Sequence, residues 1–192
     1  MSASVHPGYG PSALLTPANG VSVARVLVTP LLLVWIVDRG ATWSVETLWL
    51  VLSFTDWIDG WLARRQGATL SGAFLDPLAD KFLVLGAMGA LVHADVFPLV
   101  PVVLIAGREI AMSVYRSVVA QRGVSVPARR TAKVKTAVQD FAVGLALLPG
   151  IGDDHPAVAE TVLWVAVVLT LYTGYEYWRE ARGTVVEASR AV

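Results

Sequence analysis

The stretch TDWIDGWLARRQGATLSGAFLDPLADKF, residues 55–82, decides how this chain is interpreted, because it carries four aspartates between two strongly apolar segments. The aspartates are Asp56, Asp59, Asp76 and Asp80. Placing one aspartate at the centre of a bilayer costs about 2.5–3.5 kcal/mol on insertion scales. Four carboxylates in such a setting therefore point to a functional site.

The composition indicates an all-α integral membrane protein. Of the 192 residues, 55% are hydrophobic and 16% are charged, whereas a soluble domain carries about 25% charged residues. A bilayer crossing takes roughly 20 apolar residues. Six stretches approach or reach that length and predict six transmembrane helices, at about 21–37, 43–63, 73–92, 97–119, 132–149 and 157–178.

Basic residues predict the orientation of these helices. They gather after the second and sixth stretches and around the junction of the fourth and fifth, while the alternate connections hold mainly acidic residues. The positive-inside rule then places both termini in the cytoplasm, and the aspartates in the cytoplasmic half of the cell membrane. We expect one membrane domain over 1–182, with 1–17 an N-terminal arm or interfacial segment and 183–192 a flexible tail.

Net charge and cysteine content exclude other classes of function. The formal net charge is +0, so no global field favours a nucleic-acid partner. The chain has no cysteine, which excludes disulfides, thiolate catalysis and cysteine-bound zinc.

The spacing of the aspartates predicts two facing acidic helix surfaces. Asp56, Asp59, Gly60 and Ala63 share one helix face, since they follow the i, i+3, i+4, i+7 pattern. Gly72, Asp76 and Asp80 share the face of a second helix. The turn between is short, so the two helices are expected to be antiparallel neighbours whose acidic faces meet.

Two explanations account for the carboxylates. Arg64, Arg65 and Lys81 could neutralise them. However, the two arginines are expected at the end of the helix that faces water, and Lys81 is offset from Asp80 on its helix. Mg²⁺ or Mn²⁺ bound by carboxylate oxygens is the favoured explanation. The small residues Gly60 and Ala63 either let a ligand approach the helix backbone or serve helix packing.

The full pattern resembles the signature of the CDP-alcohol phosphotransferases. It runs Asp56-x2-Asp59-Gly60-x2-Ala63-Arg64-x7-Gly72-x3-Asp76-x3-Asp80. The resemblance implies a six-span enzyme, commonly a homodimer, that transfers a phosphatidyl or similar group from a CDP-alcohol to an acceptor hydroxyl and releases CMP. It also implies two divalent cations, Mg²⁺ or Mn²⁺, held by the four aspartates, with Asp80 as general base. Gly60, Ala63, Arg64 and Gly72 would line the CDP pocket.

Further segments resemble bacterial phosphatidylglycerophosphate synthases. One is Asn19-Gly20-Val21-Ser22-Val23-Ala24-Arg25, which departs from that group's pattern at Val21 and Ser22 although Ser22 keeps the hydroxyl. Others are Ala106-Gly107-Arg108-Glu109-Ile110, Arg116, and Lys133-Val134-Lys135-Thr136-x2-Gln139, with Ala132 where the group commonly has glycine. This resemblance implies glycerol 3-phosphate as acceptor. Asn19 and Ser22 would join the CDP site, and Arg108, Arg116, Lys133 and Lys135 would bind the acceptor phosphate.

These residues leave alternatives open. The basic cluster could instead anchor the protein to anionic lipid head groups, and Arg108 could be the buried partner of Asp140 or of a motif aspartate. Glu109 is expected to point away from Arg108, and the sixth span carries no motif. The main hypothesis is a CDP-diacylglycerol–glycerol-3-phosphate 3-phosphatidyltransferase. The alternatives are a cardiolipin synthase with phosphatidylglycerol as acceptor, a phosphatidylinositol-phosphate synthase, and a divalent-cation transporter.

Overall fold

The computed structural model describes residues 17–66, 70–121 and 130–190. Within these ranges, 17–18, 56–66, 70–75, 119–121, 130, 178 and 180–190 are described as backbone alone. The described residues form six helices: α1 (Pro17–Arg39), α2 (Trp43–Gln66), α3 (Leu70–His93), α4 (Leu99–Gln121), α5 (Arg130–Leu147) and α6 (Pro156–Arg190). For these residues, the prediction of an all-helical fold is confirmed.

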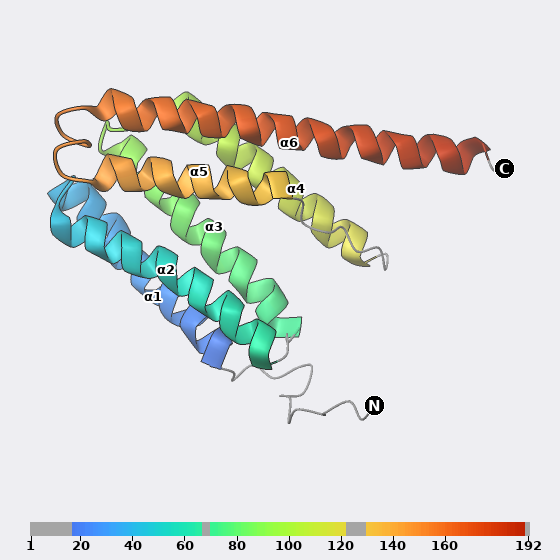
Figure 1. Cartoon of the computed structure of the whole chain (residues 1–192), viewed down its shortest axis with the longest axis horizontal. Coiled ribbons are helices and arrows are strands. Elements are labelled where there is room, and N and C mark those ends of the chain that lie inside the picture. Colours follow the sequence, from blue (N-terminus) through green and yellow to red (C-terminus); the bar gives the residue numbers. More distant parts are fainter. Residues whose placement is uncertain (1–16, 67–69, 122–129, 191–192) are drawn as a thin grey trace.

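The helices form a bundle that is tight at one end and divergent at the other (Figure 1). The short connections α1–α2, α3–α4 and α5–α6 gather at the tight end, on the left of the view. α1 packs against both α2 and α3, α5 packs along α6, and α4 also contacts α6. Both ends of the described chain lie on the divergent side, which is also where α2 ends and α3 begins.

The turn after α1 shows how the sequence sets a helix end. Gly40 has a φ of 61°, the left-handed conformation that glycine adopts without a steric penalty. Its N–H donates a 3.1 Å hydrogen bond to the carbonyl of Ile36, which closes the last turn of the helix. The chain then enters α2 at Trp43, so that α1 and α2 become antiparallel neighbours.

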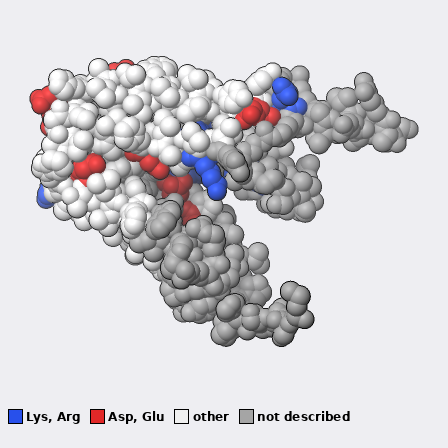
Figure 2. Space-filling view, in the orientation of Figure 1, with Lys and Arg blue, Asp and Glu red and all other residues white. Residues whose placement is uncertain are grey.

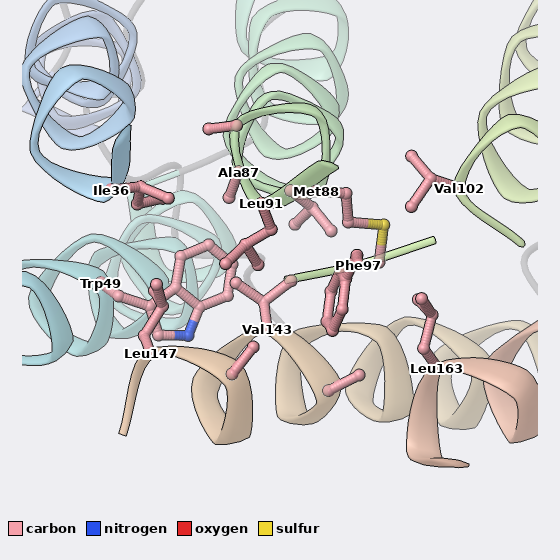
Figure 3. Close-up of a cluster of buried hydrophobic side chains, with 14 of the residues drawn as sticks. Ile36, Trp49, Ala87, Met88, Leu91, Phe97, Val102, Val143, Leu147 and Leu163 are labelled. Atoms are coloured by element: carbon pink, nitrogen blue, oxygen red, sulfur yellow. The ribbon is translucent and has the colours of Figure 1, made fainter. Parts of the chain in front are cut away.

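The apolar core lies toward the tight end and joins all six described helices with the α3–α4 connection (Figure 3). Trp49 of α2 is 2% exposed and packs among Ile36 of α1, Leu91 of α3 and Val143 of α5. Its indole nitrogen lies close to Gly144, where an added Cβ would be 3.4 Å away. A large ring therefore fills the space that this glycine leaves on α5.

The outer surface of the bundle is unusually apolar. Large side chains such as Leu27, Val34, Phe54 and Val168 are exposed by 73%, 54%, 59% and 65%. Among the described residues, Asn19–Arg39 and Pro156–Tyr177 are long and apolar enough to cross a membrane by length and composition. Exposed apolar surface on this scale marks a surface that is covered by membrane lipid or by another apolar protein surface.

The observed helices extend most of the predicted stretches by a few residues. α1 begins four residues before the predicted start at 21, and α2 continues to Gln66, past the predicted end at 63. α6 continues past Arg182 as far as Arg190, through the segment expected to be a flexible tail, and the flexibility of that segment stays a prediction. The segment contains no proline, and one internal glycine weakens a helix by only about 1 kcal/mol, so nothing in it stops the helix. The N-terminal arm, 1–16, lies outside the described residues.

Candidate active site

The predicted acidic helices are α2 and α3. Asp56, Asp59, Gly60, Ala63 and Arg64 belong to α2 and Gly72 belongs to α3, but their side chains lie outside the described residues. Asp76 and Asp80 are described, and both are partly buried on α3 one turn apart. Pro77 directly follows Asp76, so this turn of the helix lacks one backbone hydrogen bond.

A residue of α1 holds one of these carboxylates. The hydroxyl of Ser22, which is 1% exposed, donates a 2.6 Å hydrogen bond to Oδ1 of Asp76. The bond joins residues that are 54 positions apart in the sequence. It therefore places the Asn19–Ser22 segment beside the predicted metal site.

The buried face of α1 carries three polar residues at this end. Asn19, Ser22 and Arg25 are 2%, 1% and 1% exposed, and they repeat at three-residue intervals. Nε of Arg25 donates to Oγ1 of Thr55 at 3.5 Å, a long contact that links α1 to α2 just before Asp56. The motif contained Arg25, but sequence reasoning assigned it no role in the site.

The donor chemistry of this region suits hard divalent cations. Carboxylate oxygens are the ligands that Mg²⁺ and Mn²⁺ prefer. Within the part of the chain with described side chains, no three acidic or histidine residues lie close enough to hold a metal ion. Because that part includes only Asp76 and Asp80 of the predicted set, the four-aspartate arrangement stays a prediction.

A second polar cluster joins α4, α5 and α6 around Glu109. Oε1 of Glu109 accepts a 3.0 Å bond from Nη1 of Arg108 and an ion pair from Nζ of Lys135. Nη2 of Arg108 also donates to the hydroxyl of Thr173 at 2.9 Å. The expectation that Glu109 points away from Arg108 is wrong, because the long arginine side chain reaches back to its neighbour. The acidic partner of Arg108 is thus Glu109 and not Asp140.

Burial distinguishes the predicted phosphate-binding lysines. Lys135 is 3% exposed, whereas Lys133, two residues earlier on α5, is exposed. The two side chains therefore lie on different sides of the helix, as their spacing dictates. Lys135 is part of the interior of the bundle, and Lys133 remains accessible from outside.

Lys81 links α3 to the same cluster. Its ammonium donates to Oγ of Ser113, and that hydroxyl donates to the backbone carbonyl of Glu109 at 2.7 Å. Between them lies a cavity of about 20 Å³ lined by Asp80, Lys81, Val84, Leu85, Glu109, Thr136 and Gln139. A polar cavity of this volume has room for one water molecule. Asp80 and Glu109 thus face a common space.

Arg116 is held separately, near the divergent end. Its Nη2 donates to the hydroxyl of Tyr177 at 2.8 Å, and its guanidinium lies 5.4 Å from the centre of the same ring. Figure 2 shows acidic and basic side chains in the middle of the view, next to the grey region, while most of the rest of the surface that is not grey is white. The predicted acceptor residues therefore fall into two groups: Arg108 and Lys135, which contact Glu109, and Arg116 and Lys133, of which Arg116 is partly buried and Lys133 is exposed.

The sixth helix contributes partners that sequence reasoning missed. Thr170, Thr173 and Tyr177 of α6 are buried and bond to Gln139, Arg108 and Arg116. Their spacing of three and four residues puts them on one helix face. That periodic polar face within an apolar segment was the signal that could have identified them.

Comparison with known proteins gives a consistent result. A family model described as CDP-alcohol phosphatidyltransferase matches residues 15–172. A Rickettsia felis protein named CDP-diacylglycerol–glycerol-3-phosphate 3-phosphatidyltransferase is 35% identical over 170 residues, covering 85% of this chain and 94% of the relative. Proteins of the same name are 35% identical in Bacillus subtilis, over 83% of this chain and 92% of theirs, and in Pseudomonas fluorescens, over 85% and 88%.

Proposed function

Since the chain belongs to the CDP-alcohol phosphatidyltransferase family, we propose that it transfers the phosphatidyl group of CDP-diacylglycerol to glycerol 3-phosphate. The products are phosphatidylglycerol phosphate and CMP. The family resemblance predicted from residues 56–80 is confirmed by the family model, and the acceptor is that of relatives which align over most of the chain.

One observation carries the proposal on the acceptor side. Asp80, the predicted general base, lines the same small cavity as Glu109, and Glu109 contacts both Arg108 and Lys135. A base that takes a proton from an acceptor hydroxyl needs the acceptor's phosphate to be held nearby by cations. Glycerol 3-phosphate carries its hydroxyl and its phosphate on the same short molecule, so it suits this arrangement.

We assign two divalent cations, Mg²⁺ or Mn²⁺, to Asp56, Asp59, Asp76 and Asp80. The four carboxylates offer the oxygen donors that these ions prefer, and Ser22 fixes the orientation of Asp76. When bound, the ions neutralise charge on the donor's pyrophosphate and stabilise the charge that develops on the departing CMP.

The chain's own residues carry the remaining steps. The carboxylate of Asp80 takes the proton from the acceptor hydroxyl while the oxygen of that hydroxyl attacks the β-phosphorus of the donor. The new phosphorus–oxygen bond forms as the bond from the β-phosphorus to the bridging oxygen breaks. That oxygen leaves on CMP with the electron pair, and the proton stays on Asp80.

Binding of the two substrates is divided among the remaining predicted residues. Asn19, Ser22, Gly60, Ala63, Arg64 and Gly72 form the CDP-binding set. Arg108, Arg116, Lys133 and Lys135 form the acceptor-phosphate set. The ion pair between Lys135 and Glu109 does not prevent phosphate binding, because an ammonium has three donors and Glu109 takes one.

The membrane arrangement follows from the surface. We propose that residues 1–182 form one domain of six spans in the bacterial cell membrane, with both termini and the active site on the cytoplasmic side. The exposed apolar side chains and the two helices of sufficient length support a lipid-facing exterior. A soluble, charged acceptor would then enter from the cytoplasm.

The test is CMP release by the purified protein with CDP-diacylglycerol and Mg²⁺ or Mn²⁺. Glycerol 3-phosphate, phosphatidylglycerol and inositol 1-phosphate are compared as acceptors. Release that depends on glycerol 3-phosphate supports the proposal. Release with phosphatidylglycerol or inositol 1-phosphate in its place would keep the donor chemistry and overturn the assigned acceptor.

A further inference from the structure

Glu109 lies where four helices meet. It belongs to α4, its carboxylate receives Lys135 of α5, and its neighbour Arg108 extends to Thr173 of α6. Its backbone carbonyl accepts from Ser113, which in turn accepts from Lys81 of α3. The side chain retains only 10% exposure.

The two cations are held together by one atom. Arg108 and Lys135 both donate to Oε1 of Glu109. Two like charges at this separation would otherwise repel each other, most strongly in a buried site. A single carboxylate thus brings together two cations and leaves the group with an excess of positive charge.

The paired cations keep hydrogen-bond donors for a further anion. A guanidinium has five N–H donors and an ammonium has three. Nε of Arg108 has no hydrogen-bond partner among the described residues. A phosphate bound beside Oε1 would therefore meet donors that are already oriented. Little conformational entropy would be lost in ordering these side chains on binding.

We propose that Glu109 is a positioning residue of the transfer reaction, which orients Lys135 and Arg108 toward the phosphate of the acceptor. The inference rests on the proposed function and extends it to a residue that the family signature of residues 56–80 does not include. Glu109 touches neither the reacting oxygen nor the β-phosphorus, since it acts through the two cations.

A purely structural ion pair would behave differently. Loss of a structural pair lowers the amount or stability of folded enzyme and affects both substrates alike. Loss of a positioning carboxylate weakens the binding of glycerol 3-phosphate and leaves the CDP-diacylglycerol site unaffected. The KM values for the two substrates therefore separate these roles.

The experiment compares Glu109→Gln and Glu109→Asp with the wild type in detergent, with steady-state kinetics for each substrate. We expect Glu109→Gln to raise the KM for glycerol 3-phosphate by about tenfold or more, the loss expected for hydrogen bonds to charged groups. The KM for CDP-diacylglycerol should stay within about twofold, and Glu109→Asp should recover part of the loss because it keeps the charge. Glu160→Gln, which alters a carboxylate on α6 that bonds to Trp164, is the matched control. An equal change in both KM values, or no change, would overturn the inference.

A double variant tests the same inference without leaving Lys135 as an uncompensated buried charge, which could misfold the single variant. Glu109→Gln leaves Lys135 buried without its anion, whereas Glu109→Gln with Lys135→Met removes both charges together. Because Glu109 acts through both Lys135 and Arg108, adding Glu109→Gln to Lys135→Met should raise the KM for glycerol 3-phosphate by a smaller factor than adding it to the wild type. An increase as large as in the wild-type background would overturn the inference. A wild-type enzyme that does not use glycerol 3-phosphate would instead refute the proposed function.

Discussion

The hydroxyl of Ser22 on α1 donates a 2.6 Å hydrogen bond to Oδ1 of Asp76 on α3. One carboxylate oxygen of the predicted metal site is thereby oriented by a residue from the predicted CDP-binding segment. Residues that hold a metal-ligating carboxylate affect metal affinity without contacting the metal.

Replacing Ser22 with alanine should therefore raise the Mg²⁺ concentration needed for half-maximal activity by about tenfold, the effect typical of such outer-sphere partners. Ser22→Thr should keep most of the wild-type behaviour, because it retains the hydroxyl. A Mg²⁺ titration of CMP release measures the effect. Thr161→Ala is the control, since that hydroxyl bonds to the Ala157 carbonyl of its own helix. Unchanged Mg²⁺ dependence in Ser22→Ala would contradict this role.

Asp80→Asn should abolish turnover and leave CDP-diacylglycerol binding largely intact. The amide has nearly the shape of the carboxylate but cannot accept the proton of the attacking hydroxyl. Binding is followed with a CDP-diacylglycerol titration, and turnover with CMP release. Near wild-type turnover in this variant would remove Asp80 as the base.

Substitutions of the two lysines of α5 should separate effects on acceptor binding from effects on the stability of the protein. Lys133 is exposed and Lys135 is 3% exposed. Lys133→Ala should raise the KM for glycerol 3-phosphate with little change in thermal stability. Lys135→Ala should raise that KM and also destabilise the protein, but by less than the roughly 3–5 kcal/mol that an uncompensated buried charge costs, because Arg108 still pairs with Glu109. Thermal unfolding in detergent and the KM values for both substrates are measured for each of the two variants. Equal effects of Lys135→Ala on the KM values of both substrates would mean that it is not an acceptor contact.

Tyr177 should control the orientation of Arg116. Tyr177→Phe removes the 2.8 Å hydrogen bond and keeps the aromatic ring 5.4 Å from the guanidinium. We expect the KM for glycerol 3-phosphate to rise by about three- to tenfold, the range for one hydrogen bond. Tyr177→Ala should raise it further. If Tyr177→Phe matches the wild type, Arg116 does not depend on this bond for acceptor binding.

The helices and the acidic region were predictable because they depend on local patterns. Long apolar stretches broken by residues such as Gly40 predict helices and their ends, and the spacing of Asp76 and Asp80 predicts a shared helix face. Neither prediction requires knowledge of which helices are neighbours.

The partners of the basic residues depend on packing and could not be predicted in the same way. The sequence does not indicate that Lys135 is buried against Glu109, or that Arg108 reaches Thr173 at 65 positions' separation. The adjacency of Arg108 and Glu109 suggested divergent side chains, but a long flexible arginine overrides that geometry. The polar face of α6 was overlooked because each of its threonines is unremarkable within an apolar segment.

The most direct measurement follows labelled glycerol 3-phosphate into lipid while CMP release is counted in the same reaction. With wild-type protein, CDP-diacylglycerol and Mg²⁺, we expect one labelled lipid for each CMP released, and neither product with Asp80→Asn. CMP released without label in the lipid would show that the enzyme passes the phosphatidyl group to something other than glycerol 3-phosphate, and would refute glycerol 3-phosphate as the acceptor.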